Sequence, residues 1–98
     1  MSLHVLAIDT TGDVGSMALV GERGLIEEVM LDSPDGFAHV LFDEIERLLG
    51  RHALRVAQMT AFASASGPGS FTGVRVGLTA VKGLAEATGR KVIAVSNL

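Results

Sequence analysis

One glycine-rich stretch constrains the fold of this chain more than any other part of the sequence. It runs from Gly67 to Leu78 and reads Gly-Pro-Gly-Ser-Phe-Thr-Gly-Val-Arg-Val-Gly-Leu. A short apolar segment, Thr60 to Ala65, precedes it, and apolar residues at helical spacing follow it, which predicts a buried strand, a tight turn and a helix. Backbone N–H groups and the positive end of a helix dipole can face an anion at such a turn. The alternative is a turn that only redirects the chain.

The residues before this stretch predict three strands. The first, Leu3–Thr10, is mostly apolar and ends in a carboxylate and a hydroxyl, and small and apolar residues alternate in Val14–Val20. A hairpin signal, Gly-Glu-Arg-Gly, separates the second strand from the third, Leu25–Leu31. We therefore expect an antiparallel meander at the start of the fold.

Helical and strand patterns alternate in the rest of the chain. An amphipathic helix begins near Ala38 and ends near Gly50 or a turn later, and a polar connection then leads to a strand. The later elements are expected at Met59–Ala65 (strand), about Thr72–Thr88 (helix, stopped by Gly89) and Val92–Val95 (strand). The order β-β-β-α-β-α-β predicts an α/β fold with a mixed sheet flanked by helices, whose last strands are parallel.

Composition excludes several classes of protein. The 98 residues include 48% hydrophobic but only 4% aromatic residues, so the core must consist of aliphatic side chains. The net charge of −3 comes without a Lys/Arg cluster, which argues against direct nucleic-acid binding. The chain has no cysteine, no apolar run of membrane-spanning length and no signal peptide pattern. We expect a cytoplasmic protein.

Two segments together carry a family resemblance. One is Ile8-Asp9-Thr10-Thr11 followed by a strand of small residues, and the other is the glycine-rich stretch with Lys82-Gly83-Leu84-Ala85 downstream. They closely resemble the TsaB (YeaZ) family, the non-catalytic subunit of the bacterial machinery that makes threonylcarbamoyladenosine in tRNA. The resemblance covers nearly the whole chain but only the amino-terminal lobe of that family.

The resemblance implies a fold and a set of partners. The fold is actin-like (ribonuclease H-like), in which two lobes flank a nucleotide cleft; residues 1–98 would form one such lobe, with the second lobe absent from this chain. The implied partners are the catalytic paralogue that transfers the threonylcarbamoyl group and an ATPase subunit, with a homodimer in isolation. Contact with tRNA would be indirect, and no membrane is involved. The family has also been labelled glycoproteases.

The end of the first predicted strand is a candidate phosphate site. In actin-like folds the turn containing Asp9, Thr10, Thr11 and Gly12 faces nucleotide phosphates, and ATP or ADP with magnesium would be the ligand. Gly67, Gly69 and Ser70 of the glycine-rich turn are the second candidate segment. A carboxylate that only caps a turn through local hydrogen bonds is the alternative for Asp9. The glycine-rich turn lacks the Gly-Lys-Ser/Thr of a P-loop and the glycine spacing of a dinucleotide site.

Catalytic and metal-binding patterns are missing from the sequence. Ser70 does not lie in a Gly-x-Ser-x-Gly elbow, and the three histidines have no ligand spacing. In the catalytic paralogue the last strand is followed by a metal-binding His-x-x-x-His helix, and here Asn97 takes the first of those positions. Asn is a poor substitute for imidazole on a transition metal, so we expect no metal and no catalytic residues in this lobe.

The helix after the glycine-rich turn is predicted to bind a partner. Gly73, Gly77 and Gly83 each cost about 1 kcal/mol against alanine inside a helix, which suggests close approach by another element. Val76 and Ala80 lie away from its main apolar face, and a lobe this small should not bury every side of a helix. The predicted interface residues on the two helices are Leu41, Phe42, Ile45, Gly73, Val76, Gly77, Ala80 and Leu84.

Three functions remain open at this point. The first is a scaffold that activates a tRNA-modifying transferase. The second is an ATP-dependent kinase or ATPase of the actin-like superfamily that uses Asp9 directly. The third, a glycoprotease-type peptidase, requires a serine or metal constellation that the sequence does not contain.

Overall fold

The described part of the chain forms a mixed sheet with its two α-helices on one face. The computed structural model describes residues 3–10, 12, 14–32, 40–65 and 71–95, with the backbone alone for 71–75, 94 and 95. Its elements are β1 (His4–Asp9), β2 (Gly15–Gly21), β3 (Gly24–Leu31), α1 (Leu41–Arg51), the 3₁₀ turn η2 (Val56–Gln58), β4 (Ala61–Ala65), α2 (Phe71–Thr88) and β5 (Lys91–Val95). The predicted order is confirmed, and only η2 was not anticipated.

The sheet places β1 at its centre. The strand order is β3-β2-β1-β4-β5. Strand β2 pairs antiparallel with β1 and with β3, and strand β4 pairs parallel with β1 and with β5. Leu6 of β1 lies opposite Leu19 on one side and Phe62 on the other. The β2–β3 hairpin turns as predicted, with Gly24 at a φ of +111°, a conformation that side chains disfavour.

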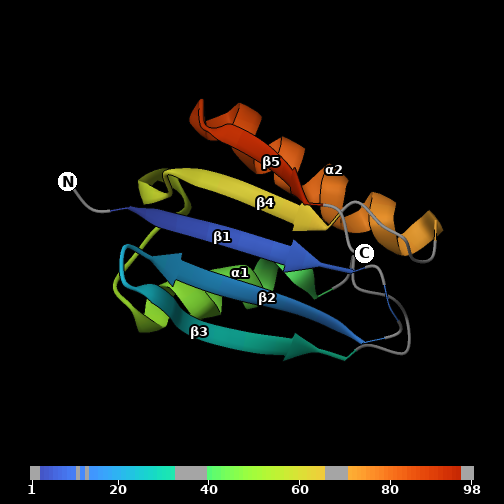
Figure 1. Ribbon diagram of the computed structural model, residues 1–98, viewed down its shortest axis with the longest axis horizontal. Helices are drawn as coiled ribbons and strands as arrows, with labels where there is room; N and C mark the ends of the chain where they lie inside the picture. The colour runs from blue at the N-terminus through green and yellow to red at the C-terminus, as the bar shows by residue number, and fades with distance from the viewer. Residues whose placement is uncertain (1–2, 11, 13, 33–39, 66–70, 96–98) are drawn as a thin grey trace.

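The core lies between one face of the sheet and the two helices, which run behind the sheet in Figure 1. This arrangement follows from the period of two, because alternate strand residues point to the same face. The core side chains are aliphatic except for Phe62, which is fully buried, and come from both layers: Leu6, Ile8, Met17, Leu19, Leu31, Leu41, Ile45, Leu48, Leu49, Met59, Phe62, Ala80, Val81 and Ala85.

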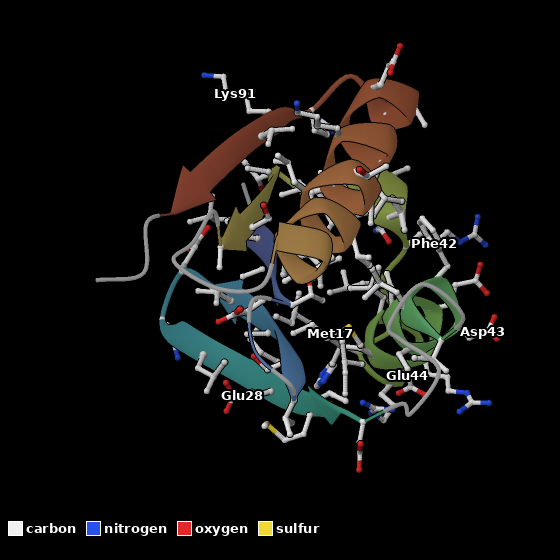
Figure 2. All side chains as sticks on the ribbon, turned by 90° about the vertical axis from the view of Figure 1, so that its right-hand side faces the viewer. Met17, Glu28, Phe42, Asp43, Glu44 and Lys91 are labelled. Atoms are coloured by element: carbon white, nitrogen blue, oxygen red, sulfur yellow. The ribbon has the colours of Figure 1, made fainter. Side chains whose placement is uncertain are left out.

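The opposite face of the sheet consists largely of small side chains. Ala7, Ala18 and Ala63 lie in one row across the strands, and they line a shallow hollow of about 240 Å³. Figure 2 shows Glu28 pointing to this side of the sheet, away from the helices. The two faces therefore differ sharply in how much of their surface the described helices cover.

Each helix is followed by a residue in the left-handed conformation, but the residue type differs between the two helices. Gly89 ends α2 at a φ of +70°, as predicted, and the Arg90 N–H donates to the Ala85 carbonyl at 3.0 Å. The residue that ends α1 is Ala53, at a φ of +56°, and the Leu54 N–H donates to the Leu49 carbonyl at 2.9 Å. None of the helices in the described part of the chain is long and apolar enough to cross a membrane.

Candidate functional site

The carboxyl end of β1 places one of the predicted phosphate-site residues, Thr10, against α2, whereas Asp9 lines the hollow on the other face of the sheet. Asp9 is half-buried at the end of the strand, and Thr10 follows it with only 1% of its surface exposed. Gly12 is exposed, with its nearest possible Cβ contact at the Val14 carbonyl oxygen, 3.7 Å away. The other members of the predicted site, Thr11, Gly67, Gly69 and Ser70, lie outside the described residues.

Thr10 makes a buried contact with the middle of α2. The Gly77 N–H donates to Thr10 Oγ1 at 3.0 Å, although the two residues are 67 positions apart. A Cβ atom at Gly77 would lie 2.7 Å from the same oxygen. The close approach predicted from the glycine therefore exists, but the element that approaches is β1 of the same lobe. No local sequence pattern pairs these two residues, because the contact depends on the position of α2 across the sheet.

On α1, the predicted interface residues divide between the core and the surface. Leu41 and Ile45 are each 1% exposed and belong to the core. Phe42 is 52% exposed, and Figure 2 shows it together with Asp43 on the side of the helices that faces away from the sheet. A partner of this helix layer would therefore contact Phe42, while Leu41 and Ile45 hold α1 to the sheet.

On α2, the structure buries more surface than the helical pattern predicted. Ala80 is only 5% exposed, and Val76 and Leu84 are half-buried against the core. The reason is that α2 contacts β4, β5, β1 and η2, so the lobe covers it from more than one side. A charged substitution at Ala80 would consequently test folding rather than dimer formation. The surroundings of Gly73 lie outside the described side chains.

Gly83 differs from Gly77 in having no neighbour within the described lobe. It is exposed, and a Cβ atom built on it would meet nothing within 4 Å. Its neighbours Thr79 and Lys82 are exposed as well. The solvent side of α2 thus has a position without a side chain, where the backbone of another molecule can approach the helix closely.

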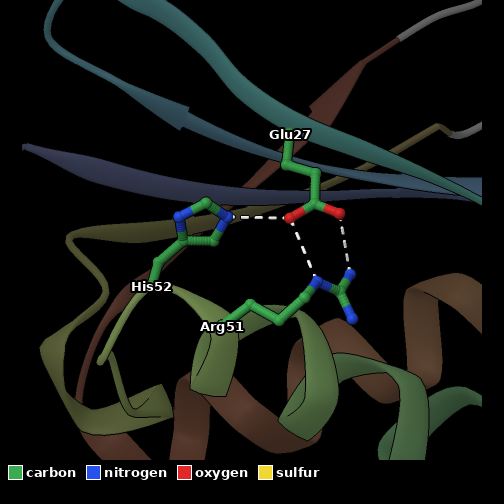
Figure 3. A network of polar contacts seen from close by, with 3 residues as sticks. All are labelled: Glu27, Arg51 and His52. Carbon is green, nitrogen blue, oxygen red and sulfur yellow. Dashed lines mark hydrogen bonds and ion pairs between the residues drawn. The ribbon is translucent and has the colours of Figure 1, made fainter.

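A polar network that the sequence did not suggest joins β3 to the end of α1 (Figure 3). Arg51 donates from Nε and Nη2 to the Glu27 carboxylate, at 3.2 and 2.8 Å, and His52 Nε2 lies 2.8 Å from Glu27 Oε1. The Arg51 and His52 hydrogen bonds hold the pKa of Glu27 below its ordinary value, and Glu27 raises the pKa of Arg51. All three groups are accessible to solvent, which screens the attraction. The network therefore ties an edge strand to a helix without forming a buried charged site.

Other chemical groups in the described residues do not form a reactive cluster. Among these residues no three His, Asp or Glu side chains are placed to hold a metal ion together. The hydroxyl of Ser64, on β4, is buried and has no hydrogen-bond partner among the residues that the structure describes. His39 lies outside the described part of the chain.

Comparisons with known proteins point to a single family. The family model described as "TsaD: tRNA N6-adenosine threonylcarbamoyltransferase" matches residues 35–98. The chain is 39% identical over 99 residues to the tRNA threonylcarbamoyladenosine biosynthesis protein TsaB of Haemophilus influenzae, covering 99% of this chain and 41% of that protein. The chain thus spans less than half the length of this curated relative.

Solved structures agree with the sequence matches. YeaZ from Pseudomonas aeruginosa superimposes with a TM-score of 0.89 at 35% identity, covering 98% of this chain and 45% of that one. RuvC of Thermus thermophilus, in complex with a Holliday junction substrate, gives a TM-score of 0.66 at 18% identity, over 96% of this chain and 65% of that one. The RuvC similarity concerns the fold alone and confirms the predicted ribonuclease H-like architecture.

Proposed function

Because the chain belongs to the tRNA N6-adenosine threonylcarbamoyltransferase family and matches TsaB and YeaZ proteins over nearly its whole length, we propose that it acts in the formation of threonylcarbamoyladenosine in tRNA. Its role is that of a non-catalytic scaffold lobe that binds and activates the catalytic paralogue. An ATPase subunit completes the complex, and tRNA is contacted through the partners. In the absence of the paralogue the same surface forms a homodimer.

The exposed Phe42 is the observation that carries this proposal. It lies on an otherwise charged solvent face of α1, whose buried face already has four aliphatic residues in the core. An aromatic side chain that is half exposed contributes little to the stability of the lobe, and aromatic residues are enriched among the energetically dominant positions of interfaces. The open surface at Gly83 on α2 supplies a second contact on the same layer of helices.

The scaffold role is tested by a pair of matched substitutions. Phe42→Glu and Met30→Glu each place a carboxylate on an exposed apolar position, at 52% and 62% exposure, but on different elements, helix α1 and strand β3. We expect Phe42→Glu to weaken binding of the catalytic paralogue by at least tenfold in calorimetry, and Met30→Glu to change it by less than twofold. Circular dichroism of both variants should match that of the unaltered chain.

Activity provides the second measurement. The paralogue, the ATPase and this protein are mixed with unmodified tRNA, and threonylcarbamoyladenosine is quantified by mass spectrometry. Phe42→Glu should lower the yield in proportion to the lost binding. Full modification without this protein would refute the scaffold role, and equal binding of the two variants would refute the choice of surface.

A further inference from the structure

The contact between Thr10 and Gly77 holds a helix through its backbone. In a regular α-helix each interior N–H points along the axis toward the carbonyl four residues earlier. Gly77 is the seventh residue of α2, and its N–H also reaches the Thr10 hydroxyl at 3.0 Å in a buried environment. The side chain of the residue that follows β1 therefore fixes the height and rotation of α2 at this helical turn.

The same contact leaves little freedom to either residue. A Cβ at position 77 would lie 2.7 Å from Thr10 Oγ1 and 3.5 Å from Ile8 Cγ2, so α2 approaches β1 as closely as its backbone allows. Threonine is branched at Cβ and therefore stiff at χ1. A displacement of the Thr10 backbone by about 1 Å would either lengthen the hydrogen bond beyond its normal range or press the hydroxyl against Gly77.

We propose that Thr10 is a positioning residue that couples the carboxyl end of β1 to the partner-binding side of α2. This inference rests on the proposed function, since α2 is taken there as part of the partner surface. Thr10 directly follows Asp9, the last residue of β1, while Gly83 lies on α2 six residues beyond the Thr10 contact. A change in the backbone at the end of β1 is passed through this contact to α2, and binding of the paralogue to α2 holds the end of β1 in return.

The first experiment measures the contact without any partner. Thr10→Val removes the hydroxyl and keeps the shape of the side chain, and Thr10→Ser keeps the hydroxyl. Amide hydrogen exchange of the full chain by NMR should show Gly77 exchanging at least tenfold faster in Thr10→Val, relative to the core strand amides, and at an unchanged relative rate in Thr10→Ser. An unchanged Gly77 rate in Thr10→Val would overturn the positioning role.

The second experiment measures coupling to the partner. Thr60→Val is the control, because Thr60 Oγ1 also accepts a backbone N–H, from His4 at 3.1 Å, but at the opposite end of β1. Affinity for the catalytic paralogue should fall about tenfold in Thr10→Val and change by less than twofold in Thr10→Ser and Thr60→Val. Equal losses in Thr10→Val and Thr60→Val would refute the coupling. If the unaltered chain does not bind the paralogue, the proposed function fails, while the exchange experiment still decides the role of Thr10.

Discussion

Gly77→Ala tests the packing of α2 on β1 with a single added methyl group. In the middle of a helix this change normally stabilises a protein by about 1 kcal/mol. Here the new Cβ would lie 2.7 Å from Thr10 Oγ1, and overpacking of a tightly packed site costs about 1–3 kcal/mol. The stiff Thr10 side chain cannot rotate away without breaking its own hydrogen bond. We therefore expect a net loss of up to about 2 kcal/mol in the free energy of unfolding.

Removing the Thr10 hydroxyl should reverse the sign of that effect. Thr10→Ala alone removes this hydrogen bond, while the helical carbonyl four residues earlier remains as an acceptor for the Gly77 N–H, and it costs about 0.5–1.5 kcal/mol. In the Thr10→Ala background the next atoms from a Cβ at Gly77 are Ile8 Cγ2 at 3.5 Å and the Cβ of residue 10 at 3.8 Å, both ordinary contacts. Gly77→Ala then keeps its gain of about 1 kcal/mol from helix propensity.

The double-mutant cycle measures the steric cost directly. Urea denaturation of the four chains, with unchanged m-values, gives the four free energies. Gly83→Ala is the control, because Gly83 has open space around it and should gain stability equally in both backgrounds. If Gly77→Ala destabilises the chain equally with and without the Thr10 hydroxyl, the contact does not set the position of α2.

Two further predictions concern the carboxyl end of α1. Ala53→Gly should raise the free energy of unfolding by about 1 kcal/mol, because Ala53 has a φ of +56° and a left-handed conformation is costly for a residue with a Cβ. The control Ala87→Gly, on the exposed side of α2, should lower the free energy of unfolding by about 1 kcal/mol, and a loss of stability in Ala53→Gly would contradict this reasoning. Glu27 has a lowered pKa in the folded chain, so its contribution to stability is complete above the ordinary glutamate pKa of about 4.3 and is lost as the pH falls through the lower folded value. Glu27→Gln should remove this acid-dependent loss in urea titrations at several pH values, whereas Glu28→Gln, on the other face of β3, should retain it.

The apolar periodicity of the sequence was sufficient to predict the order of the elements. Each strand and helix of this lobe has its own local pattern, and the turn glycines Gly24 and Gly89 have the positive φ values that their positions suggested. The end of α1 was less predictable, because the left-handed residue there is Ala53. An alanine carries no sequence signal for that conformation, and the following residues Leu54 and Val56 pack against the core.

The candidate site was only partly predictable, because its contacts join distant parts of the chain. Ala80 fell on the outer side of the helical pattern, yet it is only 5% exposed and belongs to the core. The ion pair of Glu27 with Arg51 depends on the packing of α1 against β3. Such pairings follow from how elements cross in three dimensions, and one-dimensional spacing does not contain that information.

The two described glycines of α2 show why one sequence signal led to two different structural causes. Six residues at about 100° each place Gly77 and Gly83 about 120° apart around the helix axis. Gly77 faces β1, where the Thr10 hydroxyl leaves no room for a side chain, whereas Gly83 faces open space. The helical cost of about 1 kcal/mol at Gly83 therefore has no compensating contact within the described lobe. A partner whose backbone approaches α2 closely would supply that contact, which is why the solvent side of α2 belongs with Phe42 in the proposed interface.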